Sequence, residues 1–96
     1  MYGTIAKLNV APGKLDELLE VMKQYDRLGI PGMRWSHLYQ SDDDPNVCWL
    51  AVAFDNRASY RANAENPEQN ARYQAMRALL AADPQWHDGV VLQSIA

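Results

Sequence analysis

The sequence predicts an α+β domain whose strands and helices follow the order β-α-β-β-α-β, and three patterns support this. Side chains alternate at the two-residue period of a strand in residues 2–10 and 33–40. Apolar residues recur at helical spacing in residues 15–28 and 66–82. Residues 47–54 form an uninterrupted apolar run of strand length. The whole chain, 96 residues, falls within the range of a single domain.

Local signals mark where the first elements end. Pro12 and Gly13 break the first strand. Gly29 is well placed to end the first helix, and Pro31 prevents its continuation. The polar run SDDDPN at residues 41–46 predicts an exposed turn between the second and third strands.

A short extra helix is predicted directly after the third strand. It spans residues 55–64, and either Asp55 or Asn56 acts as its cap. Tyr60 is its largest apolar side chain. This helix adds to the two longer ones without changing the order of the strands.

The last helix and strand also have clear boundary signals. Asn66 as a cap, followed by proline at the first helical position, predicts a helix start. The helix covers residues 66–82 and stops before Pro84. Residues 86–95 then form the last strand, with Gly89 as a candidate β-bulge.

This order is that of the ferredoxin-like motif, with a four-stranded antiparallel sheet and both long helices on one face. In a monomer the second face of the sheet would meet water, so residues 47–54 should alternate, yet they are apolar throughout. A chain this short buries only roughly 60% of its unfolded surface, and the lone Cys48 cannot form an internal disulfide. A second copy packed on the sheet would cover the apolar second face and add buried surface. The sequence therefore predicts a homodimer that forms a dimeric α+β barrel.

The sequence leaves open which face of the third strand meets the partner, because a register change of one residue exchanges the faces. One set is Val47, Trp49 and Ala51, and the other is Cys48, Leu50 and Val52.

Composition excludes several classes of function. A formal net charge of −3 leaves no basic stripe for nucleic acid or an anionic membrane surface. No secretory leader and no run near the roughly 18 apolar residues of a membrane span occur, so we expect a cytoplasmic protein. His37, His87 and Cys48 lack the spacing of zinc sites, and no glycine-rich phosphate loop occurs. We therefore expect no metal and no cofactor.

The element order, the short helix after the third strand and the segment FDNRASYRANAENPEQNARYQAMRALLAADPQW at residues 54–86 resemble the antibiotic biosynthesis monooxygenase (ABM)-like family of dimeric α+β barrels. That family includes cofactor-free oxygenases, haem degraders and isomerase-like proteins. The haem degraders use an Asn in the first strand, a Trp on the helix after the third strand and a His on the next helix. Those positions fall near Ala6, Asn63 and Tyr73 here, so haem degradation by that route is not expected.

The resemblance implies a cofactor-independent monooxygenase that acts on a small aromatic or quinol-type compound. Such a site needs a dry aromatic cavity, a group that takes the phenol proton and donors for the developing oxyanion. The residues expected to act in catalysis are His37 as general base, Asn63 and Tyr73. The residues expected to bind substrate are Trp35, Tyr60 and Trp86.

Other interpretations of these residues and of the fold stay open. His37 is also compatible with a structural hydrogen bond, and the three tryptophans with core or interface packing. The alternative function is a non-catalytic dimer that binds a small hydrophobic ligand or serves a stress response. An isomerase or lactone-handling enzyme on the same fold is a third possible function. Formation of a product separates the enzymes from the binding module.

Overall fold

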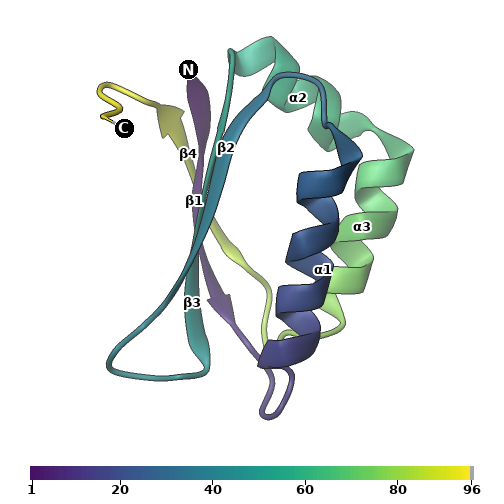
Figure 1. The fold of residues 1–96 in the computed structure, drawn as a ribbon, viewed down its shortest axis with the longest axis vertical. Coiled ribbons are helices and arrows are strands. Elements are labelled where there is room, and N and C mark those ends of the chain that lie inside the picture. The colour runs from purple at the N-terminus through teal and green to yellow at the C-terminus, as the bar shows by residue number, and fades with distance from the viewer. Residues whose placement is uncertain (96) are drawn as a thin grey trace.

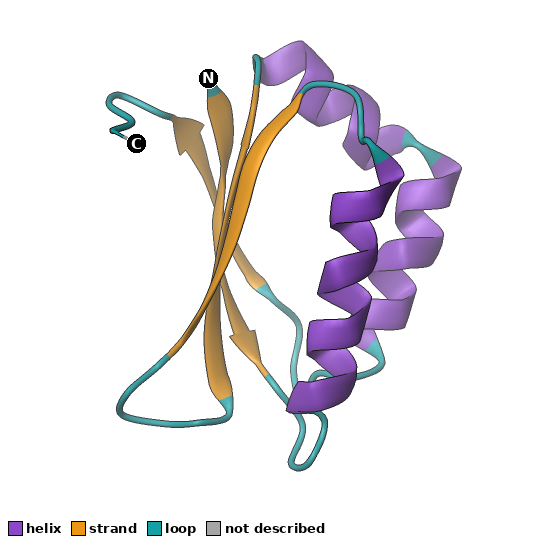
Figure 2. Ribbon diagram, viewed as in Figure 1, coloured by secondary structure: helices purple, strands orange, loops and turns teal. Residues whose placement is uncertain are grey.

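Helices pack on one face of a four-stranded antiparallel sheet. The computed structural model describes residues 1–95, with the exception of the side chain of Asp26. In chain order the elements are β1 (Tyr2–Asn9), α1 (Leu15–Leu28), β2 (Met33–Gln40), β3 (Val47–Phe54), α2 (Arg57–Glu65), α3 (Pro67–Arg77) and β4 (Gln85–Val90). The sheet forms one layer and the helices the other (Figures 1 and 2). The strand order is β2-β3-β1-β4, which confirms the predicted ferredoxin-like fold.

The register of the sheet decides which residues face the helices. Ala6 of β1 lies opposite Leu50 of β3 and Trp86 of β4, and Leu8 lies opposite Cys48. Directly opposed residues of neighbouring strands point to the same face. Because Ala6, Leu8, Cys48 and Leu50 are buried beneath the helices, their face is the helix face.

The opposite side of the sheet, which we call the outer face, carries the alternate residues. Trp49 lies opposite Lys7 and Tyr39, and Ala51 lies opposite Ile5 and His37. The register therefore answers the question that the sequence left open: the set containing Val47, Trp49 and Ala51 turns away from the helices. The outer face includes Ile5, Lys7, Trp35, His37, Tyr39, Val47, Trp49, Ala51 and His87.

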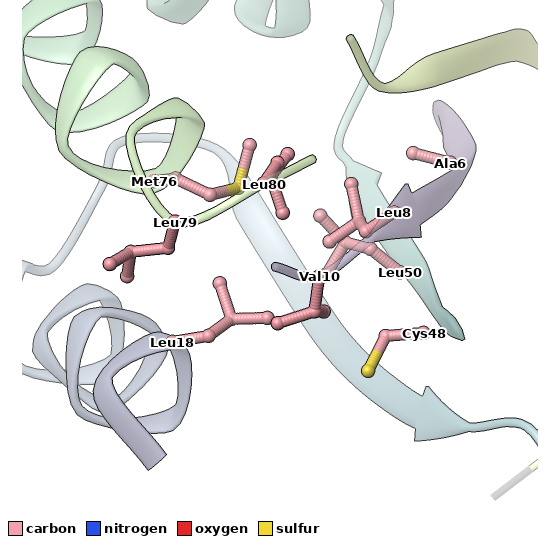
Figure 3. Close-up of a cluster of buried hydrophobic side chains, with 9 residues drawn as sticks. All are labelled: Ala6, Leu8, Val10, Leu18, Cys48, Leu50, Met76, Leu79 and Leu80. Carbon is pink, nitrogen blue, oxygen red and sulfur yellow. The ribbon is translucent and has the colours of Figure 1, made fainter. Parts of the chain in front are cut away.

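The main hydrophobic core lies between the helices and the ends of β1 and β3. Leu18 of α1 meets Val10, while Leu79 and Leu80 close the core from the segment after α3 (Figure 3). Cys48 lies in this cluster, and burial raises the pKa of its thiol. A raised pKa leaves less thiolate, so the thiol is a poor nucleophile in the folded protein.

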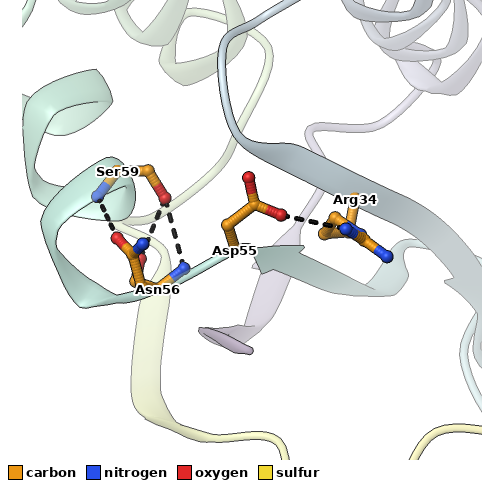
Figure 4. Close-up of polar contacts among 4 residues, drawn as sticks. All are labelled: Arg34, Asp55, Asn56 and Ser59. Atoms are coloured by element: carbon orange, nitrogen blue, oxygen red, sulfur yellow. Dashed lines mark hydrogen bonds and ion pairs between the residues drawn. The ribbon is translucent and has the colours of Figure 1, made fainter.

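The structure confirms the predicted helix caps and identifies which of the two candidate residues caps α2. Gly29 ends α1 in the left-handed conformation with φ of 58°. Asn56, not Asp55, caps α2: its side chain accepts from the Ser59 backbone N–H at 2.8 Å, and the Ser59 hydroxyl accepts from the Asn56 N–H at 3.3 Å (Figure 4). Asp55 instead accepts from Arg34 at 3.1 Å. Asn66 caps α3 through the Glu68 N–H at 2.9 Å.

Three predicted details of the fold are wrong. Helix α3 ends at Arg77 rather than Ala82, because the following backbone bonds to the end of β1: Ala11 N–H donates to Leu79 O at 2.9 Å. Strand β4 covers Gln85–Val90 rather than residues 86–95, because its ladder ends where β1 begins.

The third wrong detail is the predicted bulge. Gly89 pairs in regular register with Gly3. The irregularity of the sheet lies instead between Met33 and Trp35, where β2 shifts against β3. Such a shift re-aims the side chains that precede it, and Met33 thereby joins the helix face opposite Phe54.

Candidate functional site

A cavity of about 430 Å³ lies between the helix face of the sheet and the three helices. This volume falls in the range of about 300–1,000 Å³ typical of small-molecule sites. The lining residues from the strands include Thr4, Ser36, Leu50, Val52, Trp86 and Asp88. Those from the helices include Met22, Tyr25, Tyr60, Asn63, Tyr73 and Met76.

The sizes of the side chains on β1 explain why this part of the layer interface is open. At one end of the strand, Leu8 and Val10 fill the gap to the helices and belong to the core. Toward the other end, the helix face presents Ala6 and Thr4, which occupy less volume. Since interiors are otherwise close-packed, the smaller side chains leave space beneath the helices.

Aromatic and sulfur-containing side chains form much of the cavity wall. Tyr60 contacts Phe54 edge-on with ring centroids 5.6 Å apart. Tyr73 and Trp86 lie tilted with centroids 6.3 Å apart. The methionines Met22, Met33 and Met76 complete the apolar wall. Aromatic rings and thioethers interact favourably with a flat aromatic ligand.

A polar pair bridges the helix layer and the sheet within this lining. The Tyr60 hydroxyl donates a hydrogen bond to Asp88 Oδ1 at 2.9 Å. Burial, followed by this hydrogen bond and the negative charge of Asp88, raises the pKa of Tyr60 to about 12. The nearby Thr4 hydroxyl acts in the opposite direction on that pKa, although it is not in hydrogen-bonding geometry. Tyr60 is therefore a protonated donor and Asp88 its acceptor.

Thr4 adds an unsatisfied polar atom to the same region. Its residue is only 6% exposed, and its Oγ1 has no hydrogen-bond partner among the residues that the structure describes. Thr4 lies directly opposite Asp88 in the β1–β4 ladder, so both side chains point to the helix face. A buried hydroxyl without a partner is costly. The residue lines the cavity, but the Oγ1 atom itself is buried away from it.

The structure brings together four of the six residues that the sequence singled out. Asn63 and Tyr73, expected to act in catalysis, and Tyr60 and Trp86, expected to bind substrate, all line the cavity.

His37 and Trp35 lie elsewhere, on the outer face, stacked with ring centroids 5.3 Å apart. The sheet separates them from the cavity, so one copy of the chain does not unite them with the other four. Their alternation with Arg34 and Ser36 was as expected, but the face that they share turns away from the helices. Their predicted roles stay predictions.

Two residues of the cavity, Thr4 and Asp88, were missed by the sequence interpretation. A signal existed, because each lies at a strand position whose neighbours two residues away, Ala6 and Trp86, carry apolar side chains. A polar residue on the buried face of a strand indicates a hydrogen bond or a site. His87, the neighbour of Asp88 in the strand, points to the outer face.

Within the described part of the chain, no group of three or more His, Cys, Asp or Glu side chains could hold a metal ion. None of the helices in residues 1–95 is long and apolar enough to cross a membrane.

Comparison with known proteins identifies related sequences and folds. The family model for antibiotic biosynthesis monooxygenase matches residues 1–79. A search of curated protein sequences returns no match. Solved structures match over nearly the whole chain.

Three of these solved structures show how similar the relatives are to this chain. A protein from Chloroflexus aurantiacus, named as an antibiotic biosynthesis monooxygenase, is 25% identical with a TM-score of 0.75, over 99% of this chain and 98% of that one. One of the same name from Nitrosomonas europaea is 22% identical with a TM-score of 0.79, over 97% and 100%. SnoaB, a cofactor-independent oxygenase from Streptomyces nogalater in a mutant form, is 16% identical with a TM-score of 0.83, over 98% and 95%.

Proposed function

Because the chain belongs to the antibiotic biosynthesis monooxygenase family, we propose that it oxidises a small aromatic, quinol-type compound with molecular oxygen and without a metal or flavin. The observation that carries this proposal is the cavity, which combines aromatic walls with the Tyr60–Asp88 pair. Aromatic walls suit a flat ring, and a carboxylate suits a phenol proton.

In the proposed reaction the substrate supplies all the electrons. Asp88 accepts the proton of a phenolic hydroxyl, and the resulting phenolate makes an adjacent ring carbon electron-rich. For a methylene flanked by phenolic rings, a C–O bond to oxygen forms and the O–O bond then breaks. One oxygen atom enters the product as a carbonyl, and the other leaves as water with the two methylene hydrogens. Reactants and products therefore balance as R₂CH₂ + O₂ → R₂CO + H₂O.

The lining residues have distinct roles in this scheme. Asn63 offers an amide donor to the oxyanion that forms on the substrate, a contribution that strengthens in a site with little water. Tyr73 and Trp86 form one aromatic wall of the cavity, against which the substrate ring packs. The scheme assigns no step to His37, because the sheet lies between its side chain and the cavity of the same copy.

Oxygen consumption with a dihydroxyanthrone as probe tests this function. The wild type should exceed the spontaneous rate in buffer, and ¹⁸O₂ should place one labelled atom in the product. Asp88→Asn should lower the enzymatic rate by about a hundredfold or more, in line with loss of a general base. Asp42→Asn, in the exposed turn, makes the same change of charge and should keep the wild-type rate.

Other outcomes of this assay favour other functions. A fall in rate in His37→Ala with an unchanged Asp88→Asn would return the role of base to His37. Wild-type rates equal to buffer, with saturable binding of the probe, would support the non-catalytic ligand-binding dimer instead.

We also infer that a second copy covers the outer face. Three large side chains there remain accessible in one copy: Trp49 is 38% exposed, Ile5 55% and Tyr39 61%. Contiguous apolar faces of this kind are covered by partners, and the same face of another copy gives a closed two-fold dimer.

A further inference from the structure

We propose that the association of two copies of this chain is controlled by pH: the copies pair through the outer face while His37 and His87 are neutral, and they separate when these side chains take up protons. This switch rests on the second copy inferred under the proposed function. It goes beyond that assembly by naming the groups that control it, and it involves neither the cavity nor the oxidation.

Both histidines of the chain lie in one row that crosses the outer face. The sequence contains two histidines. In the sheet, His87 of β4 lies opposite Ile5 of β1. Ile5 lies opposite Ala51 of β3, which in turn lies opposite His37 of β2. Each of the four residues lies near the middle of its strand. This set, which we call the central row, therefore crosses the middle of the sheet and carries a histidine at each end.

Within one copy, nothing couples the two histidines to each other. Both side chains are exposed to solvent. Neighbouring strands lie about 4.8 Å apart, so three strand spacings separate His37 from His87 by roughly 14 Å, which is beyond direct contact. A single copy can therefore hold both of them in the charged form, each in contact with water.

A two-fold dimer brings the central rows of two copies together. Both partners use the same surface patch, and stacked sheets lie about 10 Å apart, so that their side chains meet. With a two-fold axis along the strands through the middle of the row, His37 of one copy lies over the partner's His87. With the axis along the row, each histidine lies over its own equivalent. Both arrangements place histidine against histidine in a face that loses contact with water.

The outer face has no carboxylate that could balance a protonated histidine. No Asp or Glu occupies an outward-facing position in the four ladders. The other charged side chain at these positions is Lys7 of β1, which is itself a cation and lies over the Trp49 ring at 5.9 Å. Tyr39 of β2 adds an uncharged phenol. Protonation of His37 and His87 therefore adds positive charge to a face that already carries a cation.

The acids nearest in sequence lie away from the central row. Asp88, the neighbour of His87, points to the helix face and accepts from Tyr60. Asp55 follows β3 and is paired with Arg34 at 3.1 Å. The acidic residues 42–44 lie in the turn beyond the ends of β2 and β3. An axis along the strands or along the row keeps that turn away from the row of either copy.

The direction of the pH effect follows from this charge balance. An ordinary histidine takes up its proton as the pH falls through about 6.5. Removal from water disfavours the charged form, and no anion of the outer face offsets that cost. The dimer therefore binds fewer protons than two separate copies. By linkage, association is strong above about pH 6.5 and weakens as the pH falls below it.

The dissociation constant of the dimer, measured by fluorescence-detected sedimentation velocity over a dilution series, tests the switch. Suitable conditions are about pH 7.5 and about pH 5.5, one unit on either side of the ordinary histidine value. Each proton released on association changes the constant about tenfold per pH unit below that value. The wild type should be a dimer at the higher pH, and its constant should rise about tenfold or more at the lower one.

Variants identify the groups responsible. The double variant His37→Gln/His87→Gln has polar, uncharged side chains at both ends of the row and no histidine elsewhere. Its dissociation constant should be equal at the two pH values. Each single variant should show a smaller pH dependence than the wild type, which decides the matter if the double variant does not dimerise. Asp42→Asn, in the exposed turn, retains both histidines and should keep the wild-type dependence. Circular dichroism at both pH values verifies folding.

Several results would overturn the switch. Equal constants at the two pH values in the folded wild type would do so and would leave the dimer itself in place. So would a wild-type pH dependence in the folded histidine variants, because another group would then be its cause. A wild-type monomer at the higher pH would remove the assembly and the switch together. Loss of the proposed oxidation is separate, since a protein that consumes no oxygen can still dissociate with pH.

Discussion

The Tyr60 hydroxyl and the Asp88 carboxylate lie 2.9 Å apart, and their hydrogen bond connects helix α2 to strand β4. These residues are 28 positions apart in the chain. The contact therefore depends on the whole fold, since α2 follows β3 and β4 lies on the far side of β1. Loss of the Tyr60 proton and removal of this hydrogen bond both have measurable consequences.

The first prediction concerns stability at alkaline pH. Folded Tyr60 keeps its proton up to a pKa of about 12, against an ordinary value of 10.0. The unfolded chain loses this proton first, so the contribution is fully present below pH 10 and is lost as the pH rises toward 12. Tyr60→Phe should therefore show a shallower fall of Tm over this window than the wild type.

Asp42→Asn, in the exposed turn between β2 and β3, is the control for this measurement, because it leaves Tyr60 and Asp88 unchanged. It should keep the wild-type fall of Tm. Equal slopes for the wild type and Tyr60→Phe would contradict the assignment. Tyrosinate absorbance should in addition lose its most alkaline component in Tyr60→Phe.

A second prediction compares two glycines that face each other in the sheet. Gly3 and Gly89 are paired between β1 and β4. A Cβ at Gly3 would overlap the carbonyl oxygen of Val52 on the other neighbouring strand, whereas a Cβ at Gly89 meets nothing within 4 Å. Gly3→Ala should lower the free energy of unfolding by about 1–3 kcal/mol, as overpacking does.

Gly89→Ala should change that free energy little, because open space surrounds its added methyl. Urea unfolding at equal protein concentration measures both variants. A loss in Gly89→Ala as large as that in Gly3→Ala would show that the close approach of β1 and β3 is not the cause.

A third prediction concerns the cap of α2. Asn56→Ala removes the acceptor of the Ser59 N–H and should cost about 1 kcal/mol of stability. Because α2 carries both Tyr60 and Asn63, its first turn also positions the cavity wall. The rate of oxygen consumption with the dihydroxyanthrone should fall along with Tm.

Asn56→Asp retains an accepting oxygen and is the control. It should preserve both stability and the rate of oxygen consumption, since Asp caps helices about as well as Asn. A wild-type rate of oxygen consumption in a destabilised Asn56→Ala would show that the cap stabilises α2 without positioning Tyr60.

A fourth prediction tests the homodimer. Ala51 lies on the outer face between Ile5 and His37, so Ala51→Glu would place a charge within the proposed interface. Native mass spectrometry should give a dimer for the wild type and a monomer for this variant. Ala58→Glu, in the exposed first turn of α2, should remain dimeric. If the wild type were a monomer at micromolar concentration, the inferred homodimer would be wrong.

The sequence was sufficient for the order of the elements and for most of their ends. Alternation and helical spacing depend on local chemistry, and so do the caps at Gly29 and Asn66. The end of α3 depends on a distant strand: Ala81 N–H donates to Asn9 O at 2.7 Å, and Leu80 bridges to Val10. Competition of this kind leaves no local signal, so the helix was expected to continue.

The candidate site was harder to predict than the fold. Asn63, Tyr73, Tyr60 and Trp86 were found because they are polar or aromatic residues in the segment that resembles the family. His37 was expected among them, and its strand alternation was correct. Periodicity separates two faces of a strand, but it does not state which one the helices cover. The pairing of β2 with β3 identifies the face of β2 that points away from the helices.

The strand order β2-β3-β1-β4 has a consequence for synthesis on the ribosome. Strand β1 is made before both of its hydrogen-bonding neighbours, so the nascent chain carries it with two open edges. Strands β2 and β3 follow one another across a short turn and can form a hairpin while translation continues. That hairpin can then capture β1, but one edge of β1 stays open until β4 has emerged. A nascent chain stalled before β4 therefore exposes a strand edge to its neighbours on a polysome, where aggregation would begin.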